Sequence, residues 1–186
     1  NWILIRNLIQ HGRVSIAYAG GRPKALKRLV IVDIAPEIEA KGLSTIRERA
    51  AAQDVFATKD LAFAAARANN SVPPVEHHRH RVMHSLMRTS SGEWTYLYDR
   101  VMRDPAHTRA GQSAAEGWAC VAAINVPALL VRGEHSDILS PAVAGRFIDS
   151  AVDARLVEVA GSGHSVPLDK PNEFLAVTST FLRESS

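Results

Sequence analysis

The chain has 186 residues, of which 46% are hydrophobic and 22% are charged, as in an ordinary globular domain. Its formal net charge is +3, and no run of Lys and Arg is dense enough to predict nucleic-acid binding. No apolar segment reaches the roughly 20 residues of a membrane span, so no membrane partner is predicted. The single cysteine, Cys120, excludes an intrachain disulfide and favours a cytoplasmic location.

The first elements alternate between strand and helix. Trp2–Ile5 is apolar and predicts a short buried strand, and Val14–Ala19 predicts a buried helix that ends at Gly20-Gly21-Arg22-Pro23. Leu29–Val32 is continuously apolar, which is typical of a strand covered on both faces in a parallel sheet. The chain opens inside an apolar run without a Met or a basic leader, so we expect that the upstream part of a larger domain precedes it.

The pattern changes to helices in the middle of the chain. Thr58 is a predicted N-cap, and Trp94–Tyr98 predicts a short strand after the Ser90-Ser91-Gly92 turn. The predicted helices are Glu37–Gln53, Lys59–Ala68, Val75–Met87 and Ser113–Ile124.

The parallel-sheet pattern returns in the last third. Strands are predicted at Ala128–Arg132 and Arg155–Val159, and helices at Pro141–Ser150, with Ser140 as N-cap, and Asn172–Arg183. We therefore predict an α/β fold with a parallel sheet and helices on both faces. Its organisation is a core of residues 1–36 and 125–186 that carries a helical insertion at 37–124.

Two polar loops follow predicted strands of this sheet. Asp137 comes after Ala128–Arg132, and His164 comes after Arg155–Val159. The loop of His164 has the sequence Gly161-Ser162-Gly163-His164-Ser165, whose glycines allow a tight turn. Sites in α/β sheets form at the carboxyl edge, and neighbouring strands lie about 5 Å apart. The sequence thus predicts contact between Asp137, as an orienting carboxylate, and His164, as a general base.

Three stretches of sequence resemble the α/β-hydrolase superfamily. PALLVRGEHSD (127–137) resembles its acid-bearing strand and loop, GSGHSVPLDKPNEF (161–174) its histidine loop and last helix, and RLVIVDIAPE (28–37) the strand before its cap. Residues 37–124 match a helical cap. The resemblance implies the C-terminal part of this fold, truncated upstream, with Asp137 as the triad acid and His164 as the base. It implies no cofactor.

The family's nucleophile belongs on the turn between the first strand and the first helix. Ile5–Arg13 occupies this place but contains no Ser, Cys or Asp, so that Leu8 or Ile9 stands at the nucleophile position. Ser15, slightly downstream, is the alternative nucleophile, although helix packing is its simpler role. An Asp137–His164 pair acting directly on water is a further alternative.

The resemblance implies a hydrolase of small-molecule esters, although C–C bond, epoxide and haloalkane chemistry use the same two residues. The alternatives are a catalytically inactive hydrolase-fold fragment, a binding module or a structural protein. Trp94, Tyr96 and Tyr98 are candidates for a substrate pocket or for plain hairpin packing. His80 and His84 have two-His metal spacing on a predicted helix, but a solvated helix face is favoured and no metal site is predicted. The apolar strand Trp2–Ile5 predicts homo-oligomer formation by edge pairing.

Overall fold

The computed structural model describes residues 3–4, 9–98 and 112–184. The chain divides into two compact units, one formed by residues 1–44 and 111–186 and the other by residues 45–110. The first unit contains the predicted parallel sheet, and the second contains a separate antiparallel sheet. None of the helices in the described ranges is both long enough and apolar enough to span a lipid bilayer.

The sheet of the first unit has four parallel strands in the order β1-β2-β6-β7. Every residue of β2 and β6 is buried, which explains their continuous apolarity. In register, Leu29 lies opposite Ala128, which lies opposite Ala154. The strands are β1 (Ile3–Leu4), β2 (Leu29–Val32), β6 (Ala128–Gly133) and β7 (Ala154–Val159).

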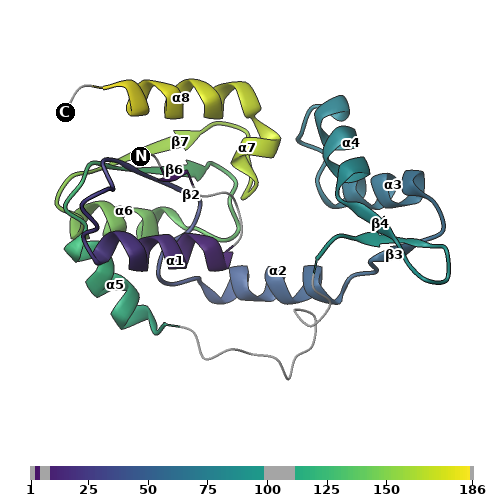
Figure 1. The fold of residues 1–186 in the computed structure, drawn as a ribbon, viewed down its shortest axis with the longest axis horizontal. Helices are drawn as coiled ribbons and strands as arrows, with labels where there is room; N and C mark the ends of the chain where they lie inside the picture. Colours follow the sequence, from purple (N-terminus) through teal and green to yellow (C-terminus); the bar gives the residue numbers. More distant parts are fainter. Residues whose placement is uncertain (1–2, 5–8, 99–111, 185–186) are drawn as a thin grey trace. The chain divides into compact units, whose positions relative to one another are not determined.

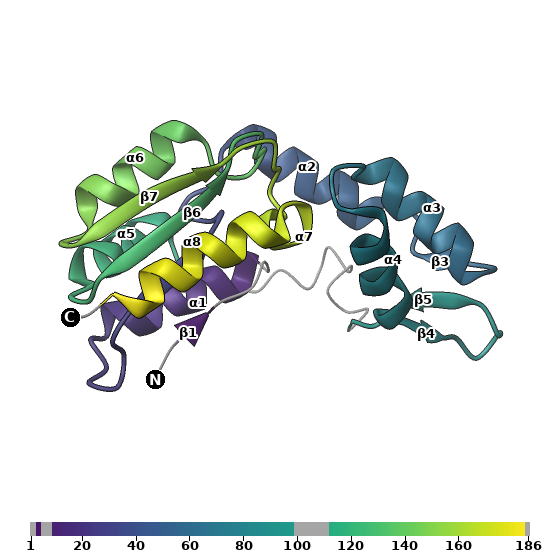
Figure 2. The ribbon, with the colours of Figure 1, turned by 90° about the horizontal axis from the view of Figure 1, so that it is seen from above.

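Helices cover both faces of this sheet, as predicted. Helix α8 lies on one face, and α1, α5 and α6 form a layer on the other (Figures 1 and 2). Successive side chains of a strand point to opposite faces of the sheet. Those on the face toward α8, which include Val30, Val131 and Val159, form one apolar cluster with Phe181 of α8. The helices are α1 (Ile9–Gly20), α5 (Ala114–Ala123), α6 (Pro141–Ser150), the short α7 (Val166–Asp169) and α8 (Pro171–Arg183).

The second unit is smaller than the expected insertion at 37–124. Helix α5 belongs to the first unit because it packs against α1, where the Cβ of a side chain at Gly20 would lie 2.8 Å from the Cα of Cys120. Helix α2 (Ala40–Ala51) spans the boundary at residue 45. The apolar, buried side of α5, with Trp118 and Val121, is therefore part of the core of the first unit.

The second unit is not purely helical. Its helices α3 (Lys59–Asn69) and α4 (Val75–His84) accompany a three-stranded sheet in the order β3-β5-β4. Helix α4 ends three residues before the predicted Met87, because Leu86–Arg88 pairs with Trp94–Tyr96 instead, and Gly92, with a φ of 90°, turns the hairpin. The strands are β3 (Val55–Phe56), β4 (Leu86–Arg88) and β5 (Trp94–Tyr96).

The predicted helix caps are confirmed. The Thr58 side chain accepts a hydrogen bond from Leu61 N at 3.2 Å, and that of Ser140 accepts one from Val143 N at 3.3 Å. Ser113 and Glu116 form a reciprocal capping box at the start of α5. Local side-chain chemistry thus sets where these three helices begin.

Candidate functional site

Three loops meet at the carboxyl edge of the parallel sheet. Asp33 directly follows β2, the segment Glu134–Leu139 follows β6, and Gly161–Ser165 follows β7. All parallel strands end at the same edge, which is where α/β sheets build their sites. Hydrogen bonds from the second and third loops converge on the Asp33 side chain.

The Asp33 carboxylate is fully buried and is satisfied by three donors. Gly133 N donates to Oδ1 at 2.8 Å, while Ser136 Oγ and His164 Nδ1 both bond to Oδ2, the latter at 2.8 Å. Burial of a carboxylate without such partners would be strongly unfavourable. Asp33 also has a φ of 52°, a left-handed conformation that Asp tolerates better than most residues. This backbone turn and the three bonds fix the carboxylate in one orientation.

The histidine side chain is only 12% exposed. A carboxylate can only accept hydrogen bonds, so the proton of the 2.8 Å bond to Asp33 belongs on Nδ1 of His164. In the neutral imidazole this tautomer places the lone pair on Nε2, the atom that a general base uses to accept a proton. The Asp33–His164 contact therefore has the geometry that an orienting acid and a general base require.

Backbone contacts hold the histidine loop against the neighbouring loops. Gly163 N donates to Asp169 Oδ2 at 2.8 Å, and Gly161 N donates to Glu134 Oε2 at 2.7 Å. Gly161 has a φ of 65°, which agrees with the predicted need for glycine beside the histidine. His135 N also donates to the carbonyl oxygen of Ser162 at 2.9 Å. These bonds fix the three residues that directly precede His164.

Gly133 explains how residues from non-adjacent strands come together. Strands β2 and β7 are separated by β6, a span of about 10 Å at usual strand spacing. A Cβ at Gly133, the last residue of β6, would lie 2.1 Å from the carbonyl oxygen of Gly163. The missing side chain lets the histidine loop cross the end of β6 and reach Asp33.

An acid that the sequence did not single out, Asp33, thus bonds directly to His164. Asp137 lies half-buried on the loop after β6, at the same edge of the sheet, and its own role stays a prediction. In the sequence, Asp33 stood out only as part of the stretch 28–37 that resembles the strand before the family's cap. The signal that could have identified it is an acid placed directly after the continuous apolar strand Leu29–Val32, which is the criterion that selected Asp137.

The predicted nucleophile region lies partly outside the described residues. Leu8 is not among them, and Ile9 is the first residue of α1. A Cβ at Gly12 would lie 2.2 Å from Cγ2 of Ile34, so this glycine allows α1 to approach the loop that follows β2. Ser15 is 5% exposed within α1, in keeping with the packing role considered for it.

The aromatic residues considered for a substrate pocket belong to the second unit. Tyr96 packs edge-on against Phe56, with ring centroids 6.1 Å apart, and its burial raises the pKa of its phenol. Tyr98 donates a 2.5 Å hydrogen bond to Asp54. These contacts are those of hairpin packing, and a role of Trp94, Tyr96 and Tyr98 in binding substrate stays a prediction.

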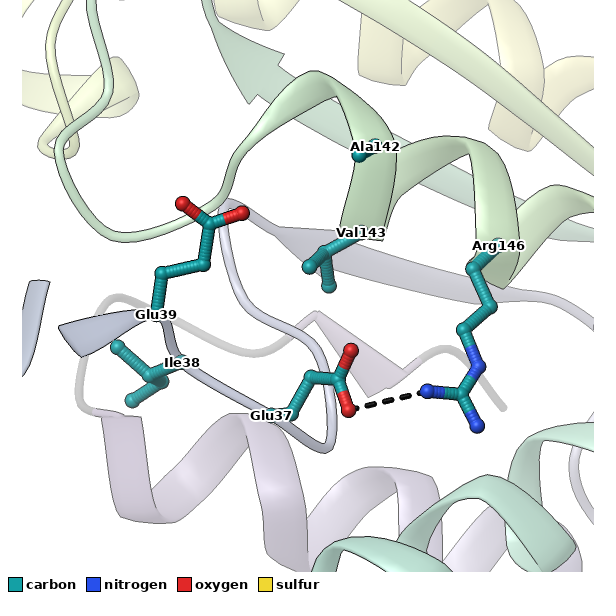
Figure 3. A pocket seen from close by; sticks show the side chains of 6 residues that line it. All are labelled: Glu37, Ile38, Glu39, Ala142, Val143 and Arg146. Carbon is teal, nitrogen blue, oxygen red and sulfur yellow. Dashed lines mark hydrogen bonds and ion pairs between the residues drawn. The ribbon is translucent and has the colours of Figure 1, made fainter.

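A surface hollow of about 440 Å³ lies beside the loop that follows Asp33 (Figure 3). Glu37 Oε2 there accepts hydrogen bonds from Arg146 at 3.0 Å and from Trp118 Nε1 at 3.1 Å, and the Arg146 guanidinium lies 4.1 Å from the Trp118 ring centroid. These contacts anchor the loop to α5 and α6. The hollow is lined by Glu37, Ile38, Glu39, Ala142, Val143 and Arg146.

Within the described ranges, no three or more His, Cys, Asp or Glu side chains are grouped so that they could hold a metal ion. His80 and His84 stack on one another, with ring centroids 4.1 Å apart, on the exposed side of α4.

No protein-family model and no curated protein sequence matches this chain. Several solved structures are similar to it. E-2-(acetamidomethylene)succinate hydrolase is similar at a TM-score of 0.78 and 22% identity, over 94% of this chain and 64% of that one. An esterase from Mycobacterium tuberculosis is similar at a TM-score of 0.72 and 26% identity, over 94% of this chain and 58% of that one. An α/β hydrolase from Novosphingobium aromaticivorans is similar at a TM-score of 0.78 and 24% identity, over 96% of this chain and 64% of that one.

The chain spans less than two thirds of the length of these three structures. It matches them over nearly all of its own residues, and its parallel sheet carries helices on both faces as the sequence resemblance predicts. The chain therefore has part of an α/β-hydrolase fold.

Proposed function

We propose that this chain is part of a hydrolase of small-molecule carboxylic esters, with His164 as its general base and Asp33 as the acid that orients it. The observation that carries the proposal is the 2.8 Å bond between His164 Nδ1 and Asp33 Oδ2 at the carboxyl edge of the sheet. The similarity to a solved esterase and to two other hydrolases supports the reaction class.

In the proposed reaction, Nε2 of His164 removes a proton from the group that attacks the ester carbonyl carbon. The C–O bond to the alcohol then breaks, and the histidine returns the proton to the departing alkoxide. Water supplies the hydroxyl of the acid product, so that ester and water become acid and alcohol. Asp33 holds the imidazole in the required tautomer and stabilises the imidazolium that forms.

Asp137 remains the alternative acid, and a matched pair of variants separates it from Asp33. We expect Asp33→Asn to lower kcat by about 10⁴-fold, as in the comparable serine-protease change, because the amide favours the wrong tautomer. Asp137→Asn should leave most of the activity. A large loss in Asp137→Asn together with an active Asp33→Asn would assign the acid to Asp137 instead.

The attacking group is not assigned. The sequence Ile-Gln-His-Gly-Arg at 9–13 contains no Ser, Cys or Asp, and Ser15 is buried in a helix. Fluorophosphonate labelling followed by mass spectrometry of the adduct identifies any nucleophilic serine. Labelling of Ser15 would support it as the nucleophile, and turnover without labelling would indicate direct attack by water.

A catalytically inactive fragment or binding module is the second candidate, and the same lack of a nucleophile at 9–13 favours it. Loss of the nucleophile in a hydrolase triad costs about 10⁶-fold in turnover. Assays with p-nitrophenyl acetate and butyrate decide between the two candidates. The ester-hydrolase proposal expects turnover that His164→Ala removes; no turnover, or turnover that survives this change, favours the inactive candidate.

A further inference from the structure

Ser136 lies between the candidate acid and the backbone of its neighbouring loop. Its hydroxyl donates to Asp33 Oδ2, and its oxygen accepts hydrogen bonds from Ile138 N and Leu139 N, each at 3.1 Å. The side chain is half-buried in the loop after β6. The two accepted bonds are those of a residue that shapes a turn. The donated bond goes beyond that role.

The two backbone donors determine where the Ser136 hydroxyl can point. Because Ile138 N and Leu139 N occupy the lone pairs of the oxygen, its one proton is directed at Asp33. Hydrogen bonds accepted by a hydroxyl also polarise it and make it a stronger donor. The bond to Asp33 is therefore fixed in direction by the fold of the loop.

The acceptor of this bond is the oxygen that also faces the histidine. Asp33 Oδ2 bonds to both Ser136 Oγ and His164 Nδ1, while Gly133 N holds the other oxygen, Oδ1. Donors at both ends prevent rotation of the carboxylate. Ser136 in addition competes with His164 for the electron density of one oxygen, so the strength of the Asp33–His164 bond depends on it.

We propose that Ser136 is a positioning residue that sets both the orientation of Asp33 and the strength of its bond to His164. Among the contacts of the described residues, the side chains that bond to the Asp33 carboxylate are those of Ser136 and His164. The inference rests on the proposed function for its catalytic consequence, but its structural core, the Ser136–Asp33–His164 chain of bonds, can be tested without any turnover.

The test compares Ser136→Ala with Ser136→Thr, which keeps a hydroxyl, and with Ser162→Ala as a matched control. Ser162 is fully buried in the histidine loop, and its hydroxyl donates to Val159 O at 2.8 Å. Its removal disturbs the same region while leaving the Asp33 contacts in place. Should Ser136→Ala fail to fold, Ser136→Cys replaces it, because a thiol is a weak donor.

The readout is the low-field proton NMR signal of His164 Nδ1–H in the full chain. We expect Ser136→Ala or Ser136→Cys to move it further downfield, because Asp33 Oδ2 no longer shares its density, and we expect Ser136→Thr to restore it. An unmoved signal, or an equal shift in Ser162→Ala, overturns the proposal. So does the absence of the signal in the unmodified chain.

If the unmodified chain hydrolyses p-nitrophenyl butyrate, Ser136→Ala should lower kcat about tenfold with KM little changed, the loss expected for one charge-assisted bond. An unchanged kcat overturns the catalytic part of the proposal. If the unmodified chain has no activity, the proposed function fails while the NMR result still decides the role of Ser136.

Discussion

The two compact units of this chain are held together in different ways. The first has a parallel sheet whose strands β2 and β6 are entirely buried between helices. The second has a small apolar cluster around Phe56, Ala62 and Val82, and its aromatic rings carry cations: Lys59 lies 4.4 Å and Arg88 5.4 Å from the Trp94 ring centroid. Contacts between cations and rings occur in both units, as between Arg146 and Trp118 in the first, so the difference lies in the extent of apolar burial.

The charge follows the same division. Residues 45–110 contain 10 Lys and Arg against 7 Asp and Glu, so the whole formal net charge of +3 lies in the second unit and the first is balanced. The first unit has specific ion pairs, such as Arg132 with Glu158 and Arg146 with Glu37. The comparison indicates that the first unit is built for fixed geometry, and its polar loops are where a site can be positioned accurately.

The largest expected effect is a change in the core of the first unit. Leu130→Ala removes a fully buried side chain of β6 and should cost about 2–5 kcal/mol of unfolding free energy. Chemical denaturation measures this cost. Leu175→Ala, at a position 62% exposed on α8, is the control and should change stability little. Equal costs at the two positions would contradict the burial on which the comparison depends.

The second expected effect tests the close approach at the sheet edge. Gly133→Ala should destabilise the chain by about 1–3 kcal/mol, because the new Cβ must displace the carbonyl oxygen of Gly163. It should also displace His164 from Asp33, which the Nδ1–H signal reports. Gly145→Ala is the matched control in α6, where no atom lies within 4 Å of the new Cβ, and it should stabilise the helix slightly. Similar melting behaviour of both variants would refute the steric argument.

Helix caps allow one test in each unit. Ser113→Ala in the first unit and Thr58→Ala in the second should each cost about 1 kcal/mol, because each hydroxyl satisfies a backbone N–H of the first helical turn. Thermal melts compare the two. A much larger cost in one unit would show that the caps contribute to packing beyond the local bond.

The Ser113 cap also has a pH dependence. The hydrogen bonds of Glu116 to the side chain and backbone of Ser113 lower the pKa of its carboxyl below the usual 4.5. The stability that the ionised Glu116 carboxyl gives to the folded state is therefore complete above pH 4.5, and it is lost as the pH falls through the lowered pKa. Melts of Glu116→Gln should lack this acid-side decline, and a decline of the same size in the variant would exclude Glu116 as its source.

A smaller effect is expected from the cation–π contacts of Trp94 in the second unit. Trp94→Leu should cost about 1 kcal/mol beyond the loss of packing, since two cations lose their ring partner. A double-mutant cycle with Lys59→Met isolates the Lys59–Trp94 term by chemical denaturation. A coupling energy near zero would mean that the contact between Lys59 and the Trp94 ring does not stabilise the second unit.

The smallest expected effect is weak self-association of the first unit. Strand β1 stands at the end of the described parallel sheet, and we propose that this edge pairs with a second copy of the chain. Light scattering at micromolar concentration should give a mass above that of a monomer, and Ile3→Lys should reduce it. A monodisperse monomer would remove this proposal.

The sequence by itself determined the strands of the parallel sheet, their burial on both faces and the starts of two helices. Continuous apolarity identified Leu29–Val32 and Ala128–Arg132 as strands covered on both faces, because burial on two sides leaves no place for polar residues. Capping chemistry located the starts of α3 and α6, since it depends on neighbouring residues. The glycines beside His164 identified its loop for the same local reason.

Only the tertiary structure shows that Asp33 contacts the histidine. Asp137 was singled out because it and His164 follow consecutive predicted strands. The strand order β2-β6-β7, the left-handed backbone at Asp33 and the missing side chain at Gly133 bring Asp33 against His164. Strand order and close backbone approach arise from packing between distant segments, and no local pattern of residues encodes them.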